Sequence, residues 1–168
     1  MLIPTHHDLS QDVRQKEVEF LNRRLADSID LVYQAKQAHW NVKGAEFRSL
    51  HKLFDQVAET VDEYVDLFAE RIVQLGGVAE GTVQSAVRVT SLPEYPLDLL
   101  DGMTHVRLLC EHTALYAAYL RQGIQFSTDL EDQVTVDILT DGARDIDKLV
   151  WMMESHLFGQ GEIKQAAA

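Results

Sequence analysis

The chain contains few of the residues that crosslink or interrupt a fold. Its 168 residues include one cysteine, which excludes a disulfide within the chain, and only three prolines. No apolar run approaches the roughly 20 residues that a membrane span requires. The first residues, MLIPTHHDLSQD, lack the basic and apolar regions of a secretory signal. We therefore expect a cytoplasmic protein without a membrane segment, in which Cys110 is a reduced, packed thiol.

Positive charge is also scarce. The chain has 15 Lys and Arg residues against 27 Asp and Glu residues, which gives a formal net charge of −12. No Lys or Arg precedes Arg14, and only Lys164 follows Lys148. Such a surface repels nucleic acid and anionic membranes and attracts cations, although acidity also serves solubility alone. The charge therefore argues against a nucleic-acid partner.

Long proline-free stretches with a 3.6-residue apolar period predict an all-α protein. The length predicts one domain over residues 1–168, with short tails at 1–9 and 160–168. We expect long helices at about 10–40, 46–75, 102–126 and 130–158. The long connection over 76–96 is how a ferritin-like four-helix bundle joins its second and third helices. A short further helix is expected at 97–100.

The predicted core follows the apolar stripe of each helix. In the first helix, the stripe is Val18, Leu21, Leu25, Ile29, Val32 and Ala35, and the exposed side carries Glu17, Arg23, Arg24 and Lys36. In the last helix, the stripe is Val134, Ile138, Gly142, Ile146, Leu149 and Met153. In the third helix, His105 and His112 lie seven residues apart, and we expect structural or surface roles for both.

The second helix has two chemically different sides. At about 100° per residue, an apolar stripe falls within roughly 40° of one line: Leu50, Phe54, Val57, Val61, Tyr64, Phe68, Ile72 and Leu75. Four candidate metal ligands lie between about 100° and 200° from that line: His51, Asp55, Asp66 and Glu70. Asp55 and Asp66 are about 16 Å apart along the helix, so they cannot bind one ion within one subunit.

The spacing of these ligands predicts a metal site shared between two subunits. Positions 51 and 70 have the same midpoint as positions 55 and 66. An antiparallel twofold copy of the helix, crossing at that midpoint, would place His51 opposite Glu70 of the partner subunit. It would also place Asp55 opposite Asp66 of the partner subunit. His39 precedes the turn before this helix, so it would lie near His51 across a helical hairpin.

The ligand types indicate redox chemistry on a hard metal. Imidazole and carboxylate without thiolate suit iron, manganese or zinc. A hard anionic shell favours Fe(III) over Fe(II), and two irons about 3.5–4 Å apart could deliver two electrons to one peroxide without releasing a hydroxyl radical. The alternative is an ordinary solvated acidic helix face, against which the two histidines and the shared midpoint argue. The acidic start of the last helix likewise has two explanations: the helix dipole, or a path for cations where subunits meet.

Two segments resemble the Dps family of ferritin-like miniferritins. They are HWNVKGAEFRSLHKLFDQVAETVDEYVDLFAERIVQLGG and DILTDGARDIDKLVWMMES, and the likeness extends over residues 10–160. The resemblance implies a hollow dodecamer that oxidises Fe(II) with hydrogen peroxide, or with oxygen, at ferroxidase sites on twofold interfaces. It also implies storage of a ferric mineral and protection against oxidative stress.

The resemblance also implies roles for individual residues. The implied iron ligands are His39, His51 and Asp55 of one subunit with Asp66 and Glu70 of its twofold mate, and zinc is a second candidate for this site. Trp40 would pack beside the site and take up oxidising equivalents. The residues implied to line a pore through which iron enters are Glu131, Asp132, Asp137 and Asp141.

Three alternatives remain. A protein that binds and compacts DNA, with secondary iron chemistry, is disfavoured by the lack of a basic tail. A larger ferritin with an iron site inside each bundle needs Glu-x-x-His pairs, and no Glu in this sequence has a His three residues later. A metal-free helical scaffold is the third. The sequence also leaves open whether further ligands come from His6, His7, His105, His112 or His156.

Overall fold

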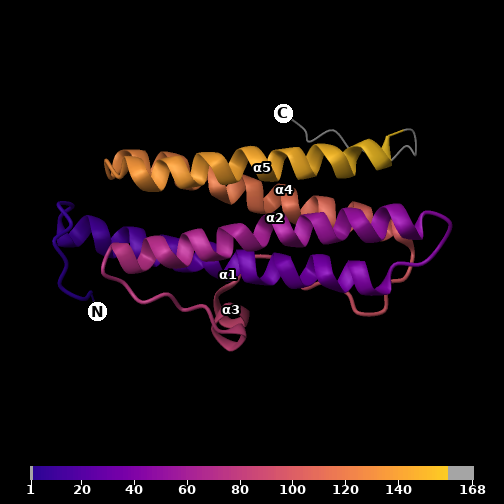
Figure 1. The fold of residues 1–168 in the computed structure, drawn as a ribbon, viewed down its shortest axis with the longest axis horizontal. Helices are drawn as coiled ribbons and strands as arrows, with labels where there is room; N and C mark the ends of the chain where they lie inside the picture. Colours follow the sequence, from indigo (N-terminus) through magenta and orange to yellow (C-terminus); the bar gives the residue numbers. More distant parts are fainter. Residues whose placement is uncertain (1, 159–168) are drawn as a thin grey trace.

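The structure consists of four long helices and one short one. The computed structural model describes residues 2–158. Its helices are α1 (Gln11–Asn41), α2 (Phe47–Gln74), α3 (Val83–Val89), α4 (Gly102–Asp129) and α5 (Gln133–Leu157) (Figure 1). This part of the chain contains no strand, and its extended pairing is one isolated bridge between Lys43 and Asp101. The tail predicted at 160–168 lies outside the described residues.

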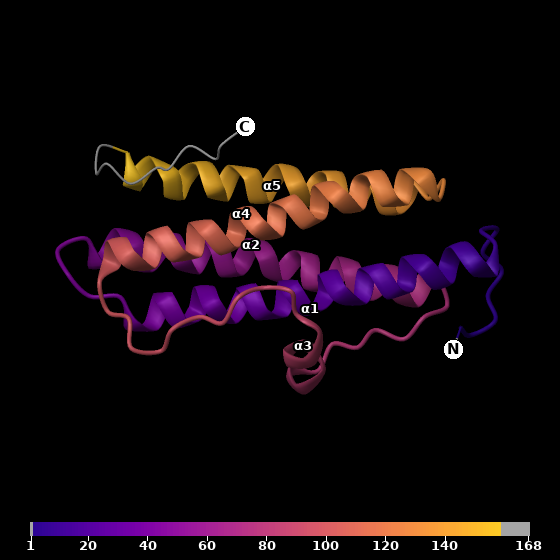
Figure 2. The ribbon, with the colours of Figure 1, turned by 180° about the vertical axis from the view of Figure 1, so that it is seen from behind.

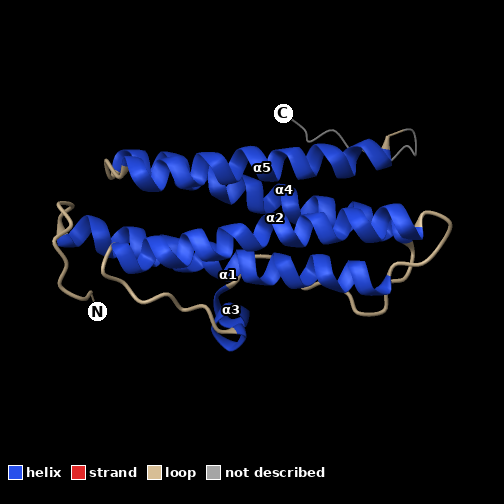
Figure 3. Cartoon of the chain, in the orientation of Figure 1, coloured by secondary structure: helices blue, strands red, loops and turns tan. Residues whose placement is uncertain are grey.

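The four long helices form two antiparallel hairpins, α1 with α2 and α4 with α5, which pack into one bundle (Figures 1 and 2). The connection from α2 to α4 returns along the outside of α1, and α3 lies within it, against α1. The all-helical arrangement, coloured by element in Figure 3, confirms the predicted ferritin-like bundle with its long crossover. Within residues 2–158, no helix is long and apolar enough to cross a membrane.

Polar side-chain caps fix where α1, α4 and α5 begin, whereas α2 has none. At the start of α1, the Ser10 side chain accepts a hydrogen bond from a backbone N–H three residues later, and the Asp101 side chain does the same for α4. Such caps satisfy N–H groups that have no partner inside the helix. The chain leaves α2 through Gly76, whose φ of 82° a side chain would strain.

The short helix of the crossover is not where the sequence predicts it. The prediction places it at 97–100, whereas the structure places it at Val83–Val89, where the Thr82 side chain caps its start. Residues 97–100 are not helical. One reason is that the Leu99 carbonyl is used elsewhere, accepting a hydrogen bond from His105 Nε2–H at 3.0 Å.

The boundary between α4 and α5 also differs from the prediction. The Ser-Thr-Asp sequence at 127–129 predicts a break, but α4 continues through it. The Ser127 hydroxyl donates to Glu17 of α1, and the Thr128 hydroxyl donates to the Ile124 carbonyl one turn earlier, so neither competes with the helix. The chain turns instead at Glu131, which has a positive φ of 60°. The N-cap of α5 is Asp132.

Two charged residues predicted on the exposed side of α1 are buried. Glu17 is 0% exposed and Arg24 is 6% exposed. The Arg24 guanidinium pairs with Asp27 at 2.8 Å and lies over the rings of Phe20 and Tyr119. Burial of the Arg24 charge is tolerated because this cation gains an anion and two aromatic faces.

The buried stripe of α5 is displaced at its start. Thr135 and Leu139 are fully buried, whereas Val134 is 55% exposed and Ile138 is half-buried. Thr135 is turned inward because its N–H and hydroxyl both donate to Asp132. Farther along, the predicted core positions are buried as expected: Gly142, Ile146, Leu149 and Met153.

The N-terminal residues are mostly exposed but contact the bundle at several points. Ile3 N–H donates to the Gly76 carbonyl at 2.7 Å, and Leu2 and Leu9 pack against the core. Arg14 of α1 donates to the Leu9 carbonyl at 3.2 Å. The segment is therefore tied to the end of the bundle at which α1 begins and α2 ends.

A buried ion pair joins the start of α5 to the end of α2. The Arg71 guanidinium donates to both carboxylate oxygens of Asp132, at 2.7 and 2.9 Å, and to the Thr135 hydroxyl at 3.0 Å. Burial alone would raise the pKa of Asp132, but the hydrogen bonds from Arg71 and Thr135 outweigh it and lower that pKa below its ordinary value.

Arg71→Met should lower the free energy of unfolding by about 3–5 kcal/mol, because it leaves the buried Asp132 carboxylate without its cation. The matched control is Arg121→Met, since Arg121 pairs with Asp147 on the surface, where the side chains are 49% and 54% exposed. The control should cost no more than about 1 kcal/mol. Denaturant unfolding followed by circular dichroism measures both, and equal losses would contradict the role of the buried pair.

Candidate metal centre

The two sides of α2 are separated as the sequence predicts. Every residue of its apolar stripe is at most 3% exposed. On the opposite arc, His51 and Asp55 are half-buried, and Asp66 and Glu70 are exposed. The candidate ligands therefore line a surface of the subunit rather than the inside of the bundle.

Two histidines meet across the α1–α2 turn. The rings of His39, near the end of α1, and His51, near the start of α2, are stacked with centroids 3.6 Å apart. His39 Nδ1–H donates to the His51 carbonyl at 2.7 Å, and His51 Nδ1–H donates to the His39 carbonyl at 2.8 Å. Because a carbonyl oxygen can only accept, each Nδ1 carries the hydrogen. In this tautomer the lone pair of each ring is on Nε2, the atom that would be available to a metal.

Asp55 lies beside this pair, on the next turn of α2. Its Oδ1 atom is 3.7 Å from His39 Nδ1 and also accepts a hydrogen bond from the Lys36 ammonium of α1. The hydrogen bond from Lys36 lowers the pKa of Asp55 below its ordinary value, so the group is a carboxylate at neutral pH. The sequence places Lys36 on the exposed side of α1 and gives it no part in the site. Its position three residues before His39 puts both on one helix face and is the signal that could have found it.

One subunit does not complete a metal site. In the part of the chain that the structure describes, no group of three or more His, Cys, Asp or Glu side chains is arranged to hold a metal ion. Asp66 and Glu70 lie farther along α2, away from His39, His51 and Asp55. The three residues near the turn would form a half-site, and both this role and its completion by a second subunit stay predictions.

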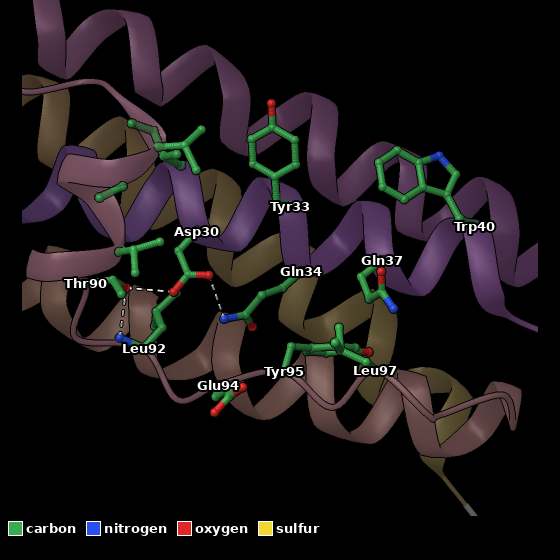
Figure 4. A pocket seen from close by; sticks show the side chains of 14 residues that line it. Asp30, Tyr33, Gln34, Gln37, Trp40, Thr90, Leu92, Glu94, Tyr95 and Leu97 are labelled. Atoms are coloured by element: carbon green, nitrogen blue, oxygen red, sulfur yellow. Dashed lines mark hydrogen bonds between the residues drawn. The ribbon is translucent and has the colours of Figure 1, made fainter.

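Trp40 is 60% exposed at the edge of a groove of about 720 Å³ between α1 and the crossover (Figure 4). In the close-up, Tyr33 and Trp40 stand out from α1 on the same side. Across the groove, α3 contributes Val83 and Val87, which are 58% and 73% exposed. Grouped apolar surface of this kind marks a site of interaction. The sequence prediction missed this outer face of α3, because it placed the short helix elsewhere.

The acidic residues at the start of α5 have different surroundings. Glu131, in the turn, and Asp137 and Asp141, on α5, are exposed, as a pore lining requires. Asp132 is 2% exposed, and its carboxylate is engaged with Arg71 and with the cap of α5. We therefore exclude Asp132 from the predicted pore, which otherwise stays a prediction.

The two histidines of α4 have structural contacts. His105 Nδ1 accepts from the Tyr95 hydroxyl at 2.8 Å, and its Nε2–H donates to the Leu99 carbonyl. His112 Nδ1–H donates to the side-chain oxygen of Gln34 at 2.6 Å. Burial lowers the pKa of both rings, which are therefore neutral and join the crossover and α1 to α4.

Comparisons with known proteins agree with this architecture. The Ferritin family, described as a ferritin-like domain, matches residues 18–158. Over 153 residues, the chain is 39% identical to a DNA protection during starvation protein of Agrobacterium fabrum, with 91% of this chain and 94% of that protein covered. The fold is similar to that of DpsC from Streptomyces coelicolor, with a TM-score of 0.89, 28% identity, and coverage of 94% and 92% of the two chains.

A Dps protein from Vibrio cholerae is also similar, with a TM-score of 0.84, 25% identity, and coverage of 89% of this chain and 93% of that chain. It is described as a member of a broad superfamily of ferritin-like diiron-carboxylate proteins. The likeness in sequence and the likeness in structure each extend over nearly the full length of the relatives. The chain therefore belongs to the ferritin-like family and, within it, to the Dps proteins.

Proposed function

We propose that this protein oxidises Fe(II) with hydrogen peroxide, or with oxygen, at sites shared by two subunits, and stores the ferric product in a hollow shell. The observation that carries the proposal is the stacked pair of His39 and His51 beside Asp55, with both Nε2 atoms left for a metal. This ligand set suits Fe(II), and it also suits zinc as a competing ion. Membership in the ferritin-like family, with a diiron-carboxylate relative, supports iron as the substrate.

The second half of the site would come from Asp66 and Glu70 of the partner subunit. Both are exposed on the arc of α2 that carries His51 and Asp55. Two Fe(II) ions held there would each give one electron to one hydrogen peroxide, whose O–O bond breaks to leave two hydroxide ions. No hydroxyl radical is then released. Trp40, next to His39, would take up oxidising equivalents when iron supplies fewer than two electrons to a peroxide.

The assembly that fits the proposal is a dodecamer built on twofold dimers. A second copy of the chain would cover the apolar groove that contains Trp40 and the outer face of α3. Iron would reach the interior through pores lined by Glu131, Asp137 and Asp141, where carboxylates attract cations. The cytoplasm is the compartment that we predict, on the basis of the single cysteine.

Binding and compaction of DNA is the alternative function, and the name of the Agrobacterium relative mentions DNA protection. Two observations weigh against it. The segment from residue 2 to residue 9 contacts the bundle and contains no Lys or Arg. The chain as a whole carries a formal net charge of −12. A gel-shift assay at low salt should show no retarded DNA.

The proposed activity is tested by adding hydrogen peroxide to the protein loaded with Fe(II) under anaerobic conditions. Ferric absorbance should appear far faster than in the same buffer without protein, with about two Fe(II) consumed per peroxide. A spin trap should report less hydroxyl radical than the protein-free reaction gives. Oxidation no faster than in buffer would show that the site does not perform this chemistry.

Lys36→Met should strengthen metal binding at the half-site. The ammonium shares the Asp55 oxygen that a cation would use, so a metal must displace it. Both side chains are about one-third exposed, which limits the expected gain in Zn²⁺ affinity to about two- to fivefold. Isothermal titration with Zn²⁺ measures the change, with Lys52→Met, one residue from His51, as the control. Weaker binding by Lys36→Met would show instead that Lys36 helps to hold the ligands in place.

A further inference from the structure

A carboxyl group without a cation of its own is buried at one end of the bundle. Glu17 of α1 is 0% exposed. Its Oε2 atom accepts a hydrogen bond from the Ser127 hydroxyl of α4 at 3.1 Å, and its Oε1 atom has no hydrogen-bond partner among residues 2–158. Burying an ionised carboxylate with so few donors is costly, whereas a neutral carboxylic acid is tolerated.

The cation that acts on Glu17 is already committed to another acid. Arg71 of α2 donates to both oxygens of Asp132 and to Thr135 of α5. Asp132, in the α4–α5 turn, adds repulsion, and α4 offers the Ser127 hydroxyl. Burial, reinforced by Asp132, outweighs the opposing effects of Ser127 and Arg71 and raises the pKa of Glu17 to about 7.

We propose that Glu17 is a proton-controlled latch, which as a neutral acid holds α1 against the last turn of α4, beside the α4–α5 turn, and which loosens the α4–α5 turn when it ionises. With Glu17 neutral, the charges of Arg71 and Asp132 balance. With Glu17 ionised, the cluster holds an extra buried negative charge, and opening the turn lets water reach it. The exposed acids Asp137 and Asp141 follow directly on α5. An effect on iron passage therefore rests on the proposed function, whereas the latch itself does not.

The direction of the pH effect follows from the two pKa values. The pKa of the Glu17 carboxyl is raised from an ordinary value of 4.5 to about 7 in the folded chain. Between these values the closed state holds a proton that the opened state releases, so opening becomes easier as the pH rises. Below this pH range the closed state has its full stability, and above it the stability that the proton contributes is completely lost.

Hydrogen exchange of the α4–α5 turn amides tests the latch without iron. Corrected for intrinsic rates, their protection factors should fall by up to about tenfold per pH unit between about pH 5 and pH 7 and then level off. In Glu17→Gln, which cannot ionise, this fall should be absent. Glu19→Gln, which changes an exposed glutamate on the same helix, should behave like the wild type.

Infrared difference spectroscopy tests the proton directly in the unaltered protein. The carbonyl stretch of a protonated carboxylic acid should be present at about pH 6 and lost by about pH 8.5, and Glu17→Gln should lack it. The proposal is overturned if the wild type has no protonated carboxyl near pH 6, or if Glu17→Gln keeps the wild-type fall in protection. Neither readout depends on iron, so a failure of the ferroxidase proposal would leave both results unchanged.

Discussion

Subunits that carry His51→Ala and subunits that carry Asp66→Ala should each fail to oxidise Fe(II) alone, and should regain activity when they are assembled together. If the site is shared across a twofold axis, a mixed dimer has one site that lacks both ligands. Its other site keeps His51 from one subunit and Asp66 from the other. Random mixing should therefore restore about one quarter of the wild-type sites.

The measurement is the initial rate of peroxide-dependent ferric absorbance, normalised to assembled protein. Each variant alone should lose at least about 10- to 100-fold, the loss that even outer contacts of metal sites produce. The control mixes His51→Ala with the double variant His51→Ala/Asp66→Ala. This mixture should stay inactive, because every site then lacks His51. If co-assembled single variants show no recovery, the ligands do not lie across a subunit boundary.

Val87→Asp should break the assembly while leaving the subunit folded. In the isolated subunit, Val87 is 73% exposed on α3, so an aspartate there is solvated at little cost. In the proposed dimer, the same position faces the groove of the second copy. Because the dimer is twofold symmetric, the aspartates of both subunits would be buried, each at a free-energy cost of several kcal/mol. Fe(II) oxidation should be lost together with the assembly, because each half-site loses its partner.

Sedimentation velocity and circular dichroism separate these two effects. Val87→Asp should sediment as a small species with an unchanged helical spectrum. Val87→Thr, which keeps the branched shape without adding charge, should stay assembled. A variant Val87→Asp that remains fully assembled would show that the groove beside α3 is not the contact between copies.

Local periodicity explains why the sequence predicts the second helix and its two sides so well. The buried stripe from Leu50 to Leu75 and the polar arc opposite it depend on sequence spacing alone, because one helix fixes both. The bundle wiring was predictable for a similar reason, since the length of the crossover excludes a tight hairpin. What the sequence does not contain is the second subunit, which the proposed site requires.

The errors occur where distant segments decide the outcome. Glu17 precedes Leu21 by four residues and so lies on the apolar stripe, but its charge predicts exposure. Its burial depends on Ser127, which only folding brings near. From the sequence alone, Asp132 is likewise expected to be a surface acid, because its partner Arg71 belongs to α2 and only the fold brings the two together. The pairing of charged groups across a bundle is therefore the information that helix periodicity alone cannot supply.

The reciprocal contacts of His39 and His51 have an entropic consequence. Each ring is tied to the backbone of the other helix, so neither is free to rotate before a cation arrives. The rotamer freedom that metal ligands usually lose on binding was already lost when the chain folded. A cation would therefore meet two imidazoles whose orientation is already fixed on each subunit, which favours rapid capture without rearrangement.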